Sequence, residues 1–128
     1  MTIAETLQIR SGTSLWFSPI EWLHLLGPLP PGVRMVGDPA SSTVSVVFVS
    51  NAASVRWLAN THRGALPVVP TLWICYPTTG RPDFTRDYLL STVAAHGLRP
   101  VAEIQVEPGW SALRFGLPVP GAPPFVAI

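Results

Sequence analysis

The stretch Thr43–Val49 (TVSVVFV) decides the fold of this 128-residue chain. Apart from one serine and one phenylalanine, all of its residues are β-branched, and apolar side chains fall on both faces of an extended chain. A strand with two apolar faces is typical of the centre of a parallel sheet that is covered by helices on each side. The stretch therefore predicts a three-layer α/β domain.

The segments that follow this strand predict a helix and then a second strand. Ser50 or Asn51 is a good helix cap, and Val55, Leu58, Ala59 and His62 then share one helical face, which predicts a helix up to about His62. A second apolar run, Thr71–Tyr76 (TLWICY), predicts the next buried strand.

Toward the N-terminus, Ser14–Phe17 (SLWF) predicts a short buried strand. Ser18 as the cap and Pro19 at the first helical position predict a helix over Ile20–Leu26. Residues 33–36 form a weak strand, and the six-residue link that follows is too short for a helical crossover. Residues 1–13 are expected to be a polar lead-in with at most a short helix.

The C-terminal part predicts a helix followed by a hairpin. Residues 83–85 open a helix that runs to His96. Leu98–Val106 and Ala112–Phe115 are expected to pair as antiparallel strands across the turn Glu107–Gly109. We expect one domain over residues 1–117 and a Pro-rich tail over residues 118–128.

A strand–helix series closed by a hairpin resembles a truncated class I methyltransferase domain. The resemblance implies a Rossmann-like, mostly parallel sheet with strand order 2-1-3-4-6-5, in which the last strand inserts antiparallel beside its predecessors. It says little about function, because one fold supports many activities.

Three motifs resemble those of a family of small bacterial proteins whose function is unknown. They are Leu72–Pro77 (LWICYP), Asp83–Asp87 (DFTRD) and Trp110–Phe115 (WSALRF), and Phe17-Ser18-Pro19 resembles a turn of the same family. The chain departs from that pattern at Thr78, where the family usually has lysine. This departure removes a cationic side chain and puts a phosphate-binding role in doubt.

The composition limits the classes of partner. Charged residues make up 12% of the chain and the net charge is +1, which argues against broad binding to nucleic acid or anionic membranes. So little surface charge favours contact with another protein or a second copy of the chain. The start, MTIAETLQIR, does not resemble a signal peptide, so we expect a cytoplasmic protein.

Neither a cofactor nor a metal is predicted. The turn Phe17–Glu21 has no glycine to admit a nucleotide, and Pro19 lacks a backbone N–H. Asp38 stands near the end of the second strand, but it precedes Pro39 and suits a turn. The histidines show no metal-ligand spacing. Cys75 lies in an apolar run and is expected to be an inert buried thiol.

The carboxyl ends of parallel strands meet at one edge of a sheet, and ligands bind where the strand order reverses. Helix starts and polar residues at this edge predict a site for a small anionic ligand, although the same residues suit ordinary caps and turns. The candidates are Ser18, Ser50, Asn51, Tyr76, Thr78, Thr79 and Arg81. No catalytic residue is assigned; Tyr76, Arg81 and Asp83 form the group most worth inspection.

A second group marks an interaction surface or a structural motif. Arg86 in the first turn of a helix is expected to pair with Asp83 or Glu107, since a cation is unfavourable there. In Trp110–Phe115, alternation places Trp110 and Arg114 on one face and Ser111 on the other. Arg114 is expected to stack on Trp110 or to pair with Glu103 or Glu107.

Three functions follow from these observations. The favoured prediction is a non-catalytic methyltransferase-like domain used for protein–protein contact, as a homodimer. The first alternative binds or senses an anionic small molecule at the sheet edge. The second is a minimal enzyme whose reaction the residues do not identify.

Overall fold

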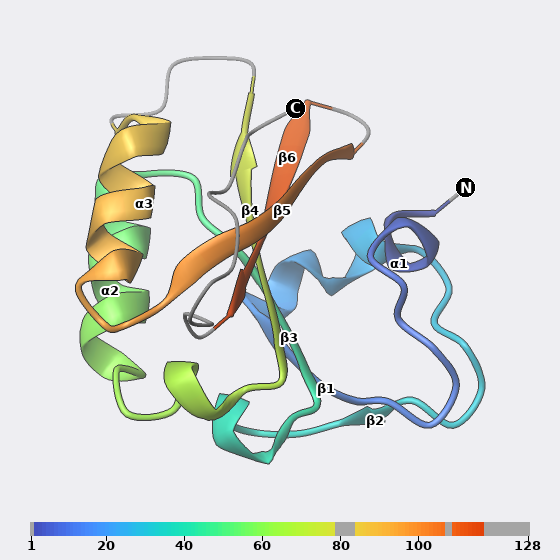
Figure 1. Ribbon diagram of the computed structural model, residues 1–128. Coiled ribbons are helices and arrows are strands. Elements are labelled where there is room, and N and C mark those ends of the chain that lie inside the picture. The colour runs from blue at the N-terminus through green and yellow to red at the C-terminus, as the bar shows by residue number, and fades with distance from the viewer. Residues whose placement is uncertain (1, 79–83, 107–108, 117–128) are drawn as a thin grey trace.

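A six-stranded sheet forms the centre of the computed structural model, which describes residues 2–78, 84–106 and 109–116 (Figure 1). The strand order is β2-β1-β3-β4-β6-β5, as expected. The strands are β1 (Ser14–Ser18), β2 (Arg34–Met35), β3 (Val44–Phe48), β4 (Thr71–Pro77), β5 (Arg99–Val106) and β6 (Trp110–Gly116).

Strands β1 to β4 pair in parallel, and the hairpin β5–β6 is antiparallel. Strand β6 lies between β4 and β5, so that Cys75 is opposite Ala112 and Ile74 is opposite Leu113. The mostly parallel sheet with a C-terminal antiparallel hairpin is therefore confirmed.

Helices cover both faces of the sheet. The helices α2 (Ala52–Thr61) and α3 (Arg86–Ala94) lie side by side on one face, whereas α1 (Ile3–Thr6) and the 3₁₀ helix η1 (Ile20–Leu26) lie on the opposite side (Figure 1). Two further 3₁₀ turns, η2 (Pro39–Ser41) and η3 (Leu66–Val68), lead into β3 and β4.

The two faces of β3 belong to two separate hydrophobic clusters. Val47 packs in the cluster beneath α2 and α3, and its neighbours Val46 and Phe48 pack in the cluster on the α1 and η1 side. This division follows from the alternation of side chains along a strand and confirms that β3 is buried on both faces.

The helix expected over residues 20–26 differs from the prediction in type and in its cap. Residues 20–26 form a 3₁₀ helix whose cap is Pro19, without a side-chain cap bond, and Ser18 is the last residue of β1. The predicted cap at Ser18 was therefore wrong. Trp22 and Leu25 recur at a spacing of three, which places both on one side of a helix with three residues per turn.

The N-terminal segment is more ordered than a polar lead-in. Thr2 Oγ1 accepts a hydrogen bond from the Glu5 amide at 3.1 Å, and the Glu5 carboxylate accepts one from the Thr2 amide, so α1 begins with a capping box. Ile3, Leu7 and Ile9 are buried and add to the cluster on the η1 side.

Candidate functional site

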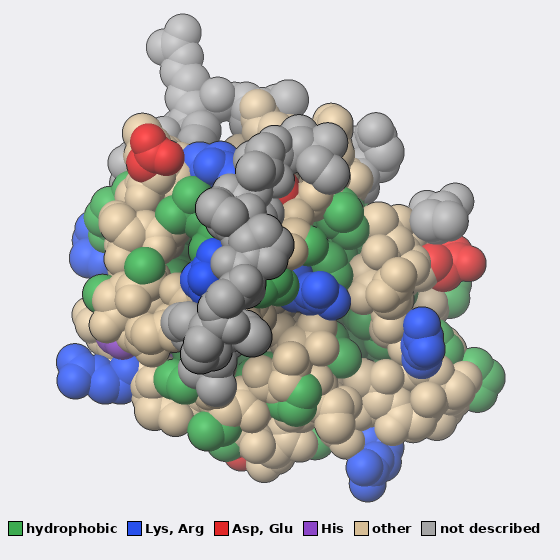
Figure 2. All heavy atoms as spheres, viewed as in Figure 1, with side chains coloured by type: hydrophobic (Ala, Val, Ile, Leu, Met, Phe, Trp, Pro, Cys, Tyr) green, Lys and Arg blue, Asp and Glu red, His purple; other side chains and the backbone are tan. Residues whose placement is uncertain are grey.

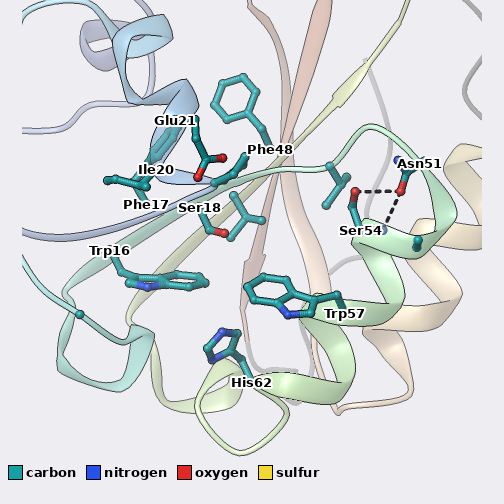
Figure 3. A pocket seen from close by; sticks show the side chains of 15 residues that line it. Trp16, Phe17, Ser18, Ile20, Glu21, Phe48, Asn51, Ser54, Trp57 and His62 are labelled. Atoms are coloured by element: carbon teal, nitrogen blue, oxygen red, sulfur yellow. Dashed lines mark hydrogen bonds between the residues drawn. The ribbon is translucent and has the colours of Figure 1, made fainter.

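A cavity of about 760 Å³ opens at the carboxyl ends of β1 and β3 (Figure 3). Strand β1 leads into η1 on one face of the sheet and β3 leads into α2 on the other, so the cavity lies where the direction of the connections reverses. This is the position at which open α/β sheets bind ligands. The lining residues come from β1, η1, β3, α2 and the loop after β2.

One wall of the cavity is aromatic. Trp16 comes from β1 and Trp57 from α2, and Figure 3 shows their indole rings side by side, with the His62 ring beneath them. The His62 ring centroid is 4.8 Å from that of Trp16 and 5.2 Å from that of Trp57, with both contacts edge-to-face. Trp16 is buried, whereas Trp57 is 48% exposed and lies at the mouth.

Polar groups line the other parts of the cavity. Asn51 Oδ1 caps α2, accepting bonds from the amide and hydroxyl of Ser54 at 2.8 and 2.9 Å. The Ser18 hydroxyl and the Glu21 carboxylate lie on the same side of the two indoles in Figure 3. Among the described residues that line the cavity, Glu21 is the one Asp, Glu, Lys or Arg.

The predicted binding edge is divided by the structure. Ser18 and Asn51 line the cavity, whereas Ser50, Tyr76 and Thr78 do not. Thr79, Arg81 and Asp83 lie outside the described residues. The sheet does not bring all the candidates together, because β4 lies between β3 and β6 and contributes no lining residue, whereas the cavity opens at the ends of β1 and β3.

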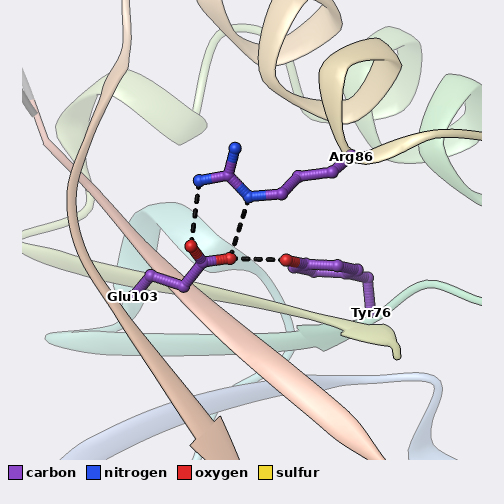
Figure 4. A network of polar contacts seen from close by, with 3 residues as sticks. All are labelled: Tyr76, Arg86 and Glu103. Atoms are coloured by element: carbon purple, nitrogen blue, oxygen red, sulfur yellow. Dashed lines mark hydrogen bonds and ion pairs between the residues drawn. The ribbon is translucent and has the colours of Figure 1, made fainter. Parts of the chain in front are cut away.

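Tyr76 belongs instead to a polar network between β4, β5 and α3 (Figure 4). Arg86 Nε and Nη2 donate to Glu103 Oε2 and Oε1 at 3.0 and 2.9 Å, and the Tyr76 hydroxyl donates to Oε2. The described partner of Arg86 is thus Glu103, which was one of the partners predicted for Arg114. Asp83 and Glu107, the partners predicted for Arg86, lie outside the described residues.

The network shifts the ionisation of its members. Burial raises the pKa of Tyr76 to about 12, and the adjacent Glu103 carboxylate adds to this rise. Burial would also raise the pKa of Glu103, but hydrogen bonds from Arg86 and Tyr76 outweigh it and lower that pKa below its ordinary value. The hydrogen bond to Glu103 raises the pKa of Arg86. The ion pair is therefore charged at neutral pH.

The strand β6 contributes packing rather than a cluster of reactive groups. The Trp110 ring centroid is 4.8 Å from that of Phe48 and 5.8 Å from that of Trp22, and both contacts are edge-to-face. Ser111 lies opposite Tyr76 and is buried. Trp110 and Ser111 therefore close the core where β4 ends.

Arg114 lies opposite Trp73 on the neighbouring strand. Arg114 Nε and Trp73 Nε1 are both buried without a hydrogen-bond partner among the described residues. The predicted pair with Glu103 was wrong, because alternation along the antiparallel hairpin directs Glu103 toward Arg86 on α3. Glu107 lies outside the described residues.

Reactive side chains are sparse elsewhere in the described ranges. Cys75 is buried, and burial raises the pKa of its thiol above the ordinary value, as expected for an inert cysteine. Residues 2–78, 84–106 and 109–116 contain no group of three His, Cys, Asp or Glu residues that could hold a metal ion. No helix within these ranges has the length and apolar character needed to cross a membrane.

The sequence pattern did not predict the aromatic wall formed by Trp16 and Trp57. Trp57 lies off the predicted apolar face of α2, and a large aromatic residue on the exposed side of a helix is a signal that was available. Trp16 was assigned to the core, and its contact with His62 depends on how β1 and the end of α2 meet in space.

Several solved structures share this fold. A putative tRNA (m1A22) methyltransferase from Streptococcus pneumoniae, solved with S-adenosyl-L-methionine, is 15% identical with a TM-score of 0.53, over 94% of this chain and 74% of that one. An NADB-Rossmann superfamily protein from Streptococcus agalactiae is 12% identical with a TM-score of 0.56, over 91% and 68%. The LepI complex with SAM is 14% identical with a TM-score of 0.54, over 91% and 39%.

Similarity of this degree shows the fold alone. It confirms the expected Rossmann-like fold and its likeness to methyltransferase domains. No protein-family model and no curated protein sequence matches the chain.

Proposed function

We propose that this chain is a non-catalytic methyltransferase-like domain that binds a small molecule with a flat aromatic ring in the cavity beside Trp16 and Trp57. The observation that carries the proposal is the pair of indoles lining a cavity of about 760 Å³ at the reversal point of the sheet. Cavities of this size and lining suit small organic ligands.

A nucleoside fits the lining best among common ligands with a flat ring. Stacking of a base on an aromatic side chain contributes about 1–3 kcal/mol. The hydroxyl of Ser18 and the carboxylate of Glu21 can hydrogen-bond to ribose hydroxyls. Solved proteins of the same fold carry adenosine-containing ligands, which supports this choice of ligand class.

The absence of catalysis is part of the proposal. Glu21 and His62 are the acid–base side chains among the described lining residues, and the His62 ring packs against both indoles. Pro19 lines the cavity where a glycine-rich turn would offer backbone N–H groups to a nucleotide. A pocket that holds a nucleoside without a paired acid and base is suited to sensing or docking.

Binding of adenosine, 5′-methylthioadenosine and S-adenosylmethionine, measured by isothermal titration calorimetry, tests the proposal. Trp57→Ala should weaken binding about tenfold, because it removes half of the stacking wall. Val68→Ala is the matched control, since Val68 is 62% exposed and does not line the cavity. No detectable binding of any of the three compounds at millimolar concentration would reject the proposal.

Self-association is a second candidate function, supported by the exposed apolar side chains at the cavity mouth. Ile20 is 57% exposed and Trp57 48% exposed, and both line the cavity. On the face seen in Figure 2, basic side chains of the described residues are scattered rather than gathered in one patch. Light scattering should then show a dimer that Ile20→Ser dissociates, and a monomer at all concentrations would exclude it.

A further inference from the structure

The sheet has two outer strands, β2 and β5, and they differ in length (Figure 1). Strand β2 has two residues, whereas β5 has eight and pairs with β6 alone among the described strands. The outer side of a strand presents a row of backbone N–H and C=O groups to which another strand can pair. Strand β5 is therefore the edge at which the sheet can be extended.

The two ends of β5 differ in how well they resist such pairing. Pro100 lacks a backbone N–H, and a bulge between Pro100 and Ala102 interrupts the regular register. The following run, Ala102–Val106 (AEIQV), contains neither proline nor lysine, the residues that commonly block an outer strand. Glu103 is the one charged residue of this run, and its ion pair with Arg86 neutralises that charge. The run is therefore open to pairing.

Side chains alternate between the two faces of the sheet along this run. Ile104 and Val106 pack in the cluster on the α1 and η1 side, whereas Glu103 binds Arg86 of α3 on the other face. Ile104 is only partly buried, and Gln105 is exposed. The described residues of the chain therefore leave part of this outer strand uncovered.

The run matches itself when it is read in the opposite direction. If a two-fold axis normal to the sheet passes through Ile104, the two copies of Ile104 lie opposite each other and Ala102 lies opposite Val106. Glu103 then lies opposite Gln105, whose amide can donate a hydrogen bond to a carboxylate. An axis through Glu103 would instead bring two carboxylates together, which is unfavourable. The register centred on Ile104 therefore pairs apolar with apolar and polar with polar residues.

This match selects a second copy of the chain over an arbitrary extended peptide. Any peptide could form the backbone hydrogen bonds of an added strand, but the side chains decide which partner fits. Two copies also repel each other little, because the net charge is +1 and charged residues make up 12% of the sequence.

We propose that the outer edge of β5 pairs antiparallel with the same edge of a second copy through Ala102–Val106, which joins the two sheets into one. Such an interface uses the same residues on both copies, as in most homodimers. The proposal goes beyond ligand binding in the cavity and does not depend on it. The interface is also distinct from the apolar side chains at the cavity mouth, Ile20 and Trp57.

A charge at the centre of the pairing tests the proposal on the full chain. Analytical ultracentrifugation of the wild type should show a monomer–dimer equilibrium. Ile104→Lys places two like charges directly opposite each other and should weaken the dimer at least about tenfold. Val68→Lys is the matched control, since it adds the same charge at a 62% exposed residue on η3 and should leave the equilibrium unchanged.

A cross-link tests the register without adding charge. Residues directly opposite each other in an antiparallel pair have Cα atoms about 4.5–5.5 Å apart, a separation that a disulfide spans. Ile104→Cys should therefore give a disulfide-linked dimer under mild oxidation, and Cys75 is buried and should not compete. Val101→Cys is the control on the same strand, because in this register its two copies lie six positions, or about 20 Å, apart.

Three results would overturn the proposal. A wild-type protein that stays a monomer at all concentrations would reject both this interface and self-association at the cavity mouth, and would leave ligand binding in place. A dimer that Ile20→Ser dissociates and Ile104→Lys does not would place the interface at the cavity mouth. Cross-linking of Val101→Cys as readily as of Ile104→Cys would exclude the register, even if circular dichroism showed that both variants fold.

Discussion

Arg86, the first residue of α3, holds both carboxylate oxygens of Glu103 in the middle of β5. The pair connects a helix to a strand at the edge of the sheet, where β5 has β6 as its neighbour within the sheet. The Glu103 side chain is 8% exposed and that of Arg86 is 32% exposed. The ion pair is therefore sheltered on the carboxylate side and open to water on the guanidinium side.

Removing the cation should destabilise the protein more than removing an exposed arginine does. Arg86→Ala leaves the Glu103 charge buried with Tyr76 as its described donor, and we expect a loss of about 1–3 kcal/mol in the free energy of unfolding. Urea denaturation at neutral pH measures it. Arg56→Ala, at an exposed position of α2, is the control, and an equal loss in both variants would contradict the role given to the pair.

Acid should lower the free energy of unfolding of the wild-type protein through protonation of Glu103. Its folded pKa lies below the ordinary 4.5, so its contribution to stability is complete above about pH 4.5 and is lost as the pH falls through the folded pKa. In Glu103→Gln this part of the pH dependence should disappear. Urea denaturation of both proteins between pH 7 and 3 tests this, and parallel curves would argue against it.

Alkali should lower the free energy of unfolding of the protein through deprotonation of Tyr76. Because the folded pKa of about 12 exceeds the ordinary value of 10, the contribution is complete below pH 10 and is lost as the pH rises from 10 to 12. Tyr76→Phe should therefore show a smaller loss of stability than the wild type between pH 10 and 12. Thermal unfolding at several alkaline pH values provides the measurement, and identical slopes would refute the assignment.

Trp110, which is packed against other rings, and Trp57, which is half-exposed, should respond differently to truncation. Trp110→Ala removes ring contacts with Phe48 and Trp22 and should cost about 2–4 kcal/mol in the free energy of unfolding. Trp57→Ala removes a half-exposed ring and should cost less than about 1 kcal/mol. Chemical denaturation of both variants measures the difference, and a larger loss at Trp57 would be inconsistent with a ligand-facing role.

Arg114 is expected to be replaceable. Its Nε is buried and has no hydrogen-bond partner in the part of the chain that the structure describes, so the native state bears the cost of desolvating that donor. Arg114→Met keeps much of the side-chain volume and removes the donor, and we expect stability to stay the same or to rise by up to about 1 kcal/mol. A loss above 1 kcal/mol, measured by urea denaturation, would show that the guanidinium makes a contribution of its own.

The sheet could be predicted from the sequence because its central strands carry strong local signals. Thr43–Val49 and Thr71–Tyr76 are apolar on both faces, which requires burial between two layers, and the resemblance to a methyltransferase domain implied the strand order. The caps at Asn51 and Thr85 were equally local, since each side chain bonds to an amide three residues ahead.

Other features depend on contacts between distant segments. The partner of Arg86 depends on which residue of β5 faces α3. That residue is set by the antiparallel register of β5 and by the bulge between Pro100 and Ala102, and the sequence pattern predicts neither. The choice between an α-helix and a 3₁₀ helix over residues 20–26 depends on tertiary packing. The aromatic wall needs Trp16 and His62 to meet across 46 positions of the chain.

Because β6 lies between β4 and β5, the sheet can be completed only after β6 has been synthesised. While a ribosome is still producing the chain, β4 presents an unpaired edge until residues 110–116 emerge, because β5 reaches the sheet through β6. The nascent polypeptide therefore holds an incomplete sheet from the time β4 is made until β6 follows, and a premature stop before residue 110 would leave a fragment prone to aggregation.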